Sequence, residues 1–182
     1  EYPDYSKDYM IAADVARGDS TDYSTFHVID VETLTQVAEY RGQLPTKDYG
    51  NMLVNAATEW NNALLVIENA NVGWAAIQPA VDRDYPNLFY SSADLSVVDT
   101  GIQLKKRFDL KTKDKMVPGF TTTSKTRPLI ISKLDTYFRE KACTVRSKRL
   151  IDELFVFVWK GSKAQAQGGY NDDLVMAYSI GM

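Results

Sequence analysis

The chain has 182 residues, of which 45% are hydrophobic and 25% charged, a length and composition that suit one compact core and leave little room for two. Its one cysteine excludes an internal disulfide, and its one histidine excludes a zinc site of the Cys/His type, so oxygen ligands and hard cations remain as the plausible metal chemistry. No apolar run is as long as a membrane span, and the N-terminus lacks the pattern of a secretory signal. We therefore expect one soluble domain, residues 1–182, from a reducing compartment and without a membrane partner.

The net charge of −3 conceals a strong asymmetry along the chain. Residues 1–104 carry 16 acids and five bases, whereas residues 105–163 carry 16 bases and six acids. One interpretation is that the two parts interleave in space and their charges pair. The other is that a phosphate-binding face lies beside an acidic metal pocket.

Both ends of the sequence are typical of a domain within a longer polypeptide. Glu1 is not a start methionine, and Met182 falls inside an amphipathic helical pattern. We expect an excised domain.

The first 60 residues predict an antiparallel meander followed by a helix. Apolar runs predict strands over 10–16, 24–31 and 35–40, separated by turn residues. Thr46 is expected to cap the helix, whose apolar face recurs at three-and-four spacing from Tyr49 to Trp60.

Residues 63–67 are a short, wholly apolar run after a helix, which is typical of a buried parallel strand. Gly73 precedes a predicted helix over 74–81, and residues 87–90 predict another short strand. This order of elements predicts an α/β fold: a ribonuclease H-like mixed sheet, with a three-strand antiparallel meander plus parallel strands, flanked by helices.

The basic half predicts an inserted hairpin and three helices. The hairpin arms are expected over 102–108 and 116–123, around a polar tip at 111–115. A helix should begin near Pro128 and end before Cys143. A second helix over 149–154 should lead into a strand over 155–159, and a loop over 160–170 should deliver Asn171 as the cap of the last helix.

Four carboxylates stand where these elements end or begin. Asp14 follows the first strand, Glu68 follows the buried strand, and Asp172 and Asp173 open the last helix. A carboxylate at the end of a buried strand costs desolvation energy unless a cation or hydrogen-bond donors meet it. Neighbouring strands lie about 4.8 Å apart, so two such carboxylates can share one metal ion or flank two.

If the strand of Glu68 lies beside that of Asp14 and the last helix packs against this edge, the four residues form the centre of a two-metal nuclease that uses Mg²⁺ or Mn²⁺. Each of these acids on its own also suits a purely structural role. Asp172 or Asp173 fits the acid that stabilises a first helical turn, and Asp14 and Glu68 fit residues that serve the fold alone.

Four segments together resemble the nuclease domain of the large terminase subunits of tailed bacteriophages: Ile11 to Ser24, Val66 to Gly73, Thr121 to Leu129 and Asn171 to Ala177. The resemblance implies that Asp14, Glu68 and one or both of Asp172 and Asp173 are the catalytic metal ligands. The activity implied is that of an endonuclease that cuts concatemeric double-stranded viral DNA during genome packaging.

The same resemblance implies an N-terminal ATPase motor, a small terminase subunit and the portal as partners, and the host cell cytoplasm as location. The motor should lie outside this chain, because no Walker-type phosphate loop occurs in it.

The basic region predicts how DNA is held. The projecting hairpin and the start of the following helix should contact the phosphate backbone through Lys105, Lys106, Arg107, Lys111, Lys113, Lys115, Lys125 and Arg127. A hairpin kept soluble by its charge, or one that docks on the motor or portal, explains the same lysines. A capped helix with a solvated first turn likewise explains Lys125 and Arg127.

Two competing functions remain at this level. One is a junction-resolving nuclease of the same superfold, and the other is a non-catalytic DNA-clamping module. Among other residues, Asp19 and Asp22 fit either turn chemistry or support of the metal ligands. His27 is expected to be packed rather than catalytic, and Trp60 and Trp159 are expected in the core.

Overall fold

A four-stranded mixed sheet is the centre of the computed structural model, which describes residues 2–18, 21–92, 116–161 and 163–182. Its strands are β1 (Tyr9–Asp14), β2 (Ser24–Asp30), β3 (Thr35–Gly42) and β4 (Leu64–Ile67), in the order β3-β2-β1-β4. β1, β2 and β3 form the expected antiparallel meander, and β4 pairs with β1 in parallel. The predicted α/β ribonuclease H-like sheet is therefore confirmed.

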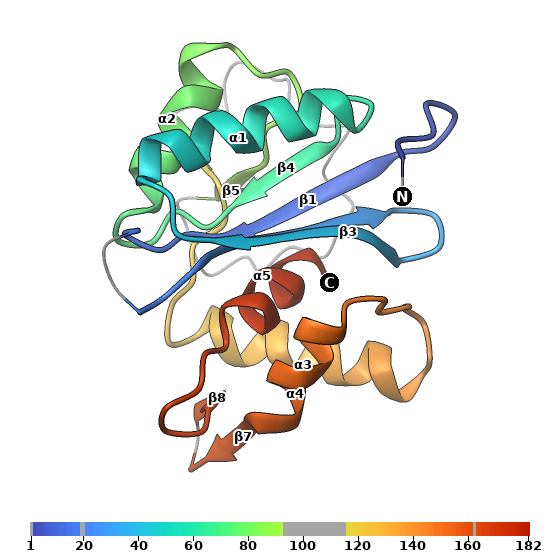
Figure 1. Cartoon of the computed structure of the whole chain (residues 1–182), viewed down its shortest axis with the longest axis vertical. Coiled ribbons are helices and arrows are strands. Elements are labelled where there is room, and N and C mark those ends of the chain that lie inside the picture. Colours follow the sequence, from blue (N-terminus) through green and yellow to red (C-terminus); the bar gives the residue numbers. More distant parts are fainter. Residues whose placement is uncertain (1, 19–20, 93–115, 162) are drawn as a thin grey trace.

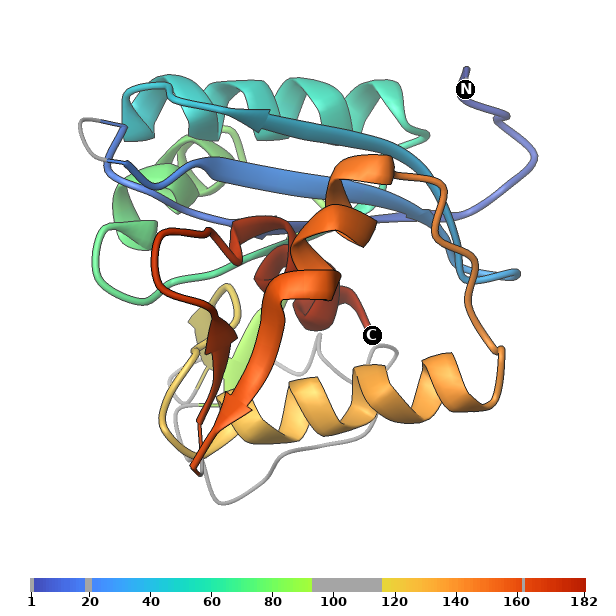
Figure 2. The ribbon, with the colours of Figure 1, turned by 60° about the horizontal axis from the view of Figure 1, so that its bottom comes forward.

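Helices cover both faces of this sheet (Figures 1 and 2). On one face lie α1 (Thr46–Glu59) and α2 (Gly73–Asp82). On the other face lie α3 (Thr126–Arg139), α4 (Lys148–Val156) and α5 (Asp173–Gly181). All five of these helices form where the sequence predicts them, although the ends differ by a few residues.

Alternation along the strands explains the two layers. Ile11 and Ala13 of β1 belong to the core beneath α1 and α2, whereas Met10 and Ala12 contact the opposite core. Both faces of a central strand are thus apolar, as expected where helices cover a sheet on both sides. In β4, Leu65 likewise faces α1 and α2.

The helix α5 is the most deeply buried of these five helices. All residues from Asp173 to Ile180 are buried, and the helix packs on β1, β2, α3 and α4. A helix that is apolar on every side belongs in the interior, and α5 fills the space between the sheet and the outer helices (Figure 2).

Two small antiparallel pairs depart from the predicted elements. β5 (Tyr90–Ser92) pairs with β6 (Met116–Pro118), so the start of the expected 116–123 arm pairs with β5, whereas the expected 102–108 arm lies outside the described residues. β7 (Phe157–Lys160) pairs with β8 (Lys163–Ala166), so the expected 160–170 loop contains a strand.

Four finer predictions have mixed outcomes. Trp60 is buried as expected, but Trp159 is 58% exposed because β7 and β8 form a projecting hairpin, in which β7 has no other strand partner among the described residues. Thr46 is the first residue of α1 and Pro45 its N-cap, so the predicted cap is wrong. Asn171 is not the cap of α5 either, because Asp172 occupies that position.

No helix among the described residues has the length and apolarity needed to cross a membrane.

Candidate metal centre

The parallel pairing of β1 and β4 places Asp14 beside Glu68. Ala13 pairs with Ile67, and the amide of Glu68 donates a hydrogen bond to the carbonyl of Ala13 at 2.9 Å. Each acid therefore directly follows the last residue of its strand that takes part in this parallel pairing. Both also follow the strand alternation onto the face that α5 covers, and their carboxyl groups share a hydrogen bond.

Asp14 carries the most perturbed carboxyl group of the centre. Burial raises its pKa well above the usual range, and the hydrogen bond to Glu68 and the negative charges of Glu68 and Asp173 raise the pKa further. The amide of Val15, which donates to Asp14 Oδ1 at 2.9 Å, opposes this effect. The centre therefore favours a proton, or a cation in its place, between the carboxyl groups.

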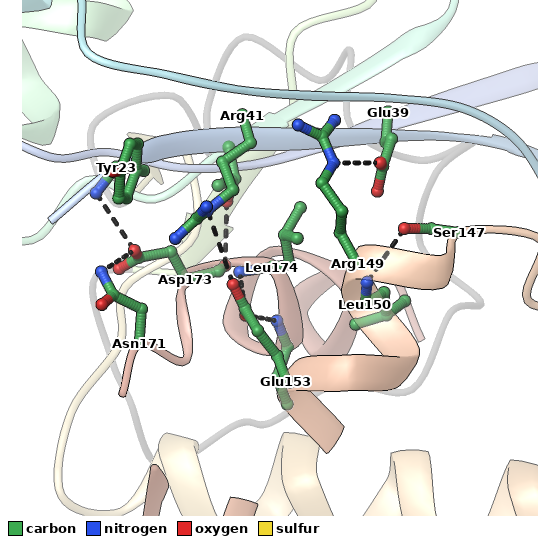
Figure 3. Close-up of polar contacts among 12 residues, drawn as sticks. Tyr23, Glu39, Arg41, Ser147, Arg149, Leu150, Glu153, Asn171, Asp173 and Leu174 are labelled. Atoms are coloured by element: carbon green, nitrogen blue, oxygen red, sulfur yellow. Dashed lines mark hydrogen bonds and ion pairs between the residues drawn. The ribbon is translucent and has the colours of Figure 1, made fainter. Parts of the chain in front are cut away.

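Asp173 reaches the centre from the first residue of α5 (Figure 3). Its Oδ2 accepts hydrogen bonds from the amide of Tyr23 at 3.0 Å and from Asn171 Nδ2 at 2.9 Å. Its carbonyl accepts from Thr25 Oγ1 at 2.8 Å, and Thr25 pairs with Asp14 across the sheet. Burial raises the pKa of Asp173, while the hydrogen bonds from Asn171 and Tyr23 lower it.

Asp172 has a different environment. Its Oδ2 lies 2.7 Å from Arg127 Nη2 and 3.4 Å from the amide of Ala166, and its side chain makes no capping bond to α5. Arg127 also donates to the carbonyl of Ala164 at 3.3 Å. A metal ion would compete with Arg127 for Asp172, and a DNA phosphate would compete with Asp172 for Arg127.

The carboxylates suit a hard divalent cation by chemistry rather than by a preformed cage. Within the described ranges, no three His, Cys, Asp or Glu side chains are spaced as a ready metal site. Asp14, Glu68 and Asp173 nevertheless interact, and they offer only oxygen donors. Oxygen donors are what Mg²⁺ and Mn²⁺ prefer, and a cation would relieve the repulsion that raises the pKa of Asp14.

One further buried acid near these carboxylates, Glu153, was not identified from the sequence. Glu153 of α4 is 9% exposed, and its Oε2 accepts from the amides of Leu174 at 2.9 Å and Val175 at 3.3 Å. Burial raises the pKa of Glu153 to about 7. The signal in the sequence was an acid three residues after Leu150, on the apolar face of a predicted helix.

His27 is buried beneath α5 and is not part of the carboxylate group. Its Nε2 lies 2.9 Å from the carbonyl of Leu174, and its Nδ1 lies 2.6 Å from Gln36 Nε2. Gln36 Oε1 accepts the amides of Arg146 and Ser147, so the amide nitrogen of Gln36 donates to His27. His27 therefore donates from Nε2 and is neutral, and burial lowers its pKa to about 4. The expected packed histidine is confirmed.

The remaining predicted residues are only partly described. The negative charge of Asp22 raises the pKa of Asp173, which places Asp22 near the centre, whereas Asp19 lies outside the described residues. Lys125 is exposed immediately before α3. The predicted DNA-binding residues of the hairpin also lie outside the described residues: Lys105, Lys106, Arg107, Lys111, Lys113 and Lys115.

The fold is that of solved large terminase nucleases. The nuclease of thermophilic phage G20c, solved with bound cobalt and with bound magnesium, has a TM-score of 0.70 and 21% identity over 99% of this chain and 82% of that chain. The nuclease domain from Thermus phage P74-26 has a TM-score of 0.66 and 21% identity over 99% of this chain and 80% of that chain. No protein-family model and no curated protein matches the sequence. The fold implied by the resemblance is therefore confirmed.

Proposed function

We propose that this chain is the metal-dependent nuclease domain of a bacteriophage large terminase, which cuts concatemeric double-stranded DNA during genome packaging. The observation that carries the proposal is the pairing that places Asp14 beside Glu68 at the carboxyl ends of two parallel strands, with Asp173 meeting them from α5. The shared fold with terminase nucleases that bind cobalt, magnesium and zinc supports it.

In this proposal Asp14, Glu68 and Asp173 hold Mg²⁺ or Mn²⁺, as two ions. When bound, such ions polarise the scissile phosphate and promote attack by water. The chain contributes the geometry: Thr25 and Tyr23 fix the position of Asp173 through its carbonyl and its carboxylate. The raised pKa of Asp14 means that cation binding competes with a proton at this carboxyl group, because a metal ligand must be ionised.

Substrate contacts and partners complete the proposal. Double-stranded DNA lies along the basic surface, where Lys125 and Arg127 flank the start of α3. Arg127 then exchanges Asp172 for a phosphate oxygen, a pairing in which arginine is geometrically favoured. In the longer protein we place an ATPase motor before this domain, with a small terminase subunit and a portal as partners in the host cytoplasm.

The decisive test is nicking of supercoiled plasmid with Mg²⁺ or Mn²⁺, with and without EDTA. Asp14→Asn should abolish cleavage and weaken the binding of Mg²⁺ measured by calorimetry. Asp135→Asn is the matched control, because Asp135 is an exposed acid on α3 that pairs with Arg139. Cleavage by Asp14→Asn at the wild-type rate would overturn the proposal. Metal-independent DNA binding without nicking would instead favour the clamping module.

The adjacent acids should differ in importance. Asp173 faces the other carboxylates, whereas Asp172 is paired with Arg127. Asp173→Asn should therefore lose more nicking activity than Asp172→Asn. A larger loss in Asp172→Asn would reverse the assignment and make Arg127 a partner that metal displaces.

A further inference from the structure

We propose that Glu153 is a positioning residue of the metal centre, which fixes the first turn of α5 and thereby holds Asp173 against Asp14 and Glu68. The inference rests on the proposed function, because it concerns the same site. Glu153 lies on a different helix from any candidate ligand, and its carboxylate accepts backbone amides of the first turn of α5 (Figure 3).

The N-cap residue of α5 makes no side-chain hydrogen bond to the first turn of the helix. The first amides of a helix have no intrahelical partner, and a side chain at the N-cap usually accepts one of them. Asp172 occupies the N-cap position of α5 but makes no capping bond, since its carboxylate is paired with Arg127. Glu153 Oε2 takes over this role from α4, by accepting the amides of Leu174 and Val175.

The other oxygen of Glu153 links the cap to the sheet. Glu153 Oε1 lies 3.6 Å from Arg41 Nε of β3, an ion pair too long for a hydrogen bond. The guanidinium of Arg41 lies over the ring of Tyr23, 3.7 Å from its centre, and the amide of Tyr23 donates to Asp173 Oδ2. Contacts therefore run in a closed ring through Glu153, Arg41, Tyr23, Asp173 and the first turn of α5.

This ring makes the position of Asp173 depend on a carboxylate that binds no substrate. Burying an acid is costly, and an apolar residue at this point of α4 would avoid that cost. The negative charge of Glu153 at the N-terminus of α5 offsets part of this cost, because it faces the helix dipole and two amides that have no partner within the helix. Without it, the first turn of α5 can fray, and Asp173 loses the orientation in which it faces Asp14.

The closing experiment compares Glu153→Gln with wild type and with Asp152→Gln. Gln keeps the shape and one acceptor oxygen but removes the charge that faces Arg41. Asp152 is the adjacent exposed acid on the same helix, so its variant controls for the charge of α4. The readouts are the dissociation constant for Mn²⁺ by calorimetry, plasmid nicking over a range of Mn²⁺ concentrations, and amide exchange of Leu174 and Val175 in EDTA.

For Glu153→Gln we expect Mn²⁺ affinity to fall by about 10- to 100-fold, as is usual for residues that orient metal ligands. Nicking should be lost at limiting Mn²⁺ and recovered at high Mn²⁺, and exchange at Leu174 and Val175 should be faster without metal. Asp152→Gln should match wild type in all three. A folded Glu153→Gln protein with wild-type Mn²⁺ affinity would overturn the positioning role, even where wild type cleaves.

Arg41→Gln tests the same ring from the sheet if Glu153→Gln fails to fold. It should also weaken Mn²⁺ binding, and unchanged affinity in a folded Arg41→Gln protein would overturn the role. The failure of the proposed function looks different, because wild type itself would then neither bind Mn²⁺ nor nick plasmid. That result would remove the basis for the positioning role as well.

Discussion

At the scale of single residues, the proposed metal ligand Asp14 should lower the stability of the metal-free protein at neutral pH. Its pKa is raised by burial and by neighbouring acids, so the folded protein binds a proton at Asp14 more tightly than the unfolded chain does. Stability in EDTA should then fall as pH rises from the unfolded pKa through the folded one. Asp14→Asn removes this loss, so the variant should be more stable than wild type at neutral pH.

Urea denaturation in EDTA at acidic and neutral pH measures this difference. The advantage of Asp14→Asn should shrink toward pH 4, where the unfolded wild-type carboxyl is also protonated. Asp135→Asn, an exposed acid, should show no such pH-dependent gain. A marked destabilisation of Asp14→Asn at neutral pH would mean that the Val15 amide, rather than a cation, is the partner that matters.

His27 offers a second test, and its resonance is unambiguous because the chain has one histidine. Burial lowers its pKa to about 4, and protonation at Nδ1 would oppose the donor of Gln36. The unfolded chain binds the proton near pH 6.5, so stability is lost as pH falls from 6.5 to 4, by about 3 kcal/mol in all.

An NMR titration of the imidazole should give a midpoint near pH 4 in the folded protein, as the lowered pKa requires. In urea the midpoint should return to the ordinary value of about 6.5. A folded midpoint near 6.5 would show that the His27 ring is reached by water and that α5 does not seal this part of the sheet.

At the scale of elements, the turn from β4 to α2 fixes Glu68. A Cβ on Gly73 would lie 2.0 Å from the carbonyl oxygen of Glu68, so any side chain there must push this backbone away. Gly73→Ala should destabilise the fold by about 1–3 kcal/mol and reduce both Mn²⁺ affinity and nicking. Denaturation, calorimetry and plasmid assays measure these effects.

Gly168→Ala is the control for Gly73→Ala, because a Cβ at Gly168 meets no atom within 4 Å. It should leave stability and metal binding close to wild type. Equal behaviour of the two variants would mean that the turn can shift without moving Glu68, and that the strand register alone places this acid.

The sequence predicted the elements that repeat a local pattern. Alternation and the short apolar run predicted β1 to β4, and the condition that β4 lies beside β1 is met. Three-and-four spacing predicted α1 and α3, and the other three helices also form where they were expected. These signals are local, because one buried face recurs within a few residues.

Contacts between distant segments escaped prediction. Glu153 caps α5 from 21 residues away, and no local rule connects an acid in one helix with the amides of another. Arg127 and Asp172 meet across 45 residues, so the sequence could not show that the two predicted site residues pair with each other. Trp159 was expected inside because an apolar run of this kind is usually buried, yet its strand belongs to a two-stranded hairpin with β8 in the part of the chain that the structure describes.

At the scale of the whole molecule, the charge asymmetry is partly resolved by pairing. Arg149 from the basic part lies 2.7 Å from Glu39 of β3 in the acidic part, whereas Arg127 pairs with Asp172, which lies outside both parts. Within the described residues, the pair of Arg149 and Glu39 therefore supports the first interpretation for this arginine. The lysines of residues 105–115 remain the basis of the second.

We expect those lysines to contact the phosphate backbone of DNA. Each phosphate contact contributes about 0.9 to the slope of log binding constant against log salt. Replacing Lys111, Lys113 and Lys115 by Gln should therefore flatten the slope by roughly two to three units while cleavage survives at the lowest salt. Fluorescence anisotropy with a duplex over a salt series measures it. Lys47→Gln on α1, which lies on the opposite face of the sheet from α3, should leave the slope unchanged.

An unchanged slope in the triple variant would show that this segment does not touch DNA. The next candidate surface would be the group formed by Lys125, Arg127, Arg146 and Arg149. Arg127 and Arg149 form ion pairs with Asp172 and Glu39, so these pairs would have to open before either arginine could bind a DNA phosphate.

The burial of α5 should couple release of a bound cation to detachment of this helix from the sheet. Asp173 lies on α5, and its hydrogen bond with Thr25 of β2 joins residues that are 148 apart in the sequence. Asp14 ends β1, and Glu68 directly follows β4. Proteins open in cooperative units, and a cation held by both sides binds only the closed form. Detachment of α5 and release of the cation would then be one event, so the supply of divalent ions would govern how long the buried helix stays docked.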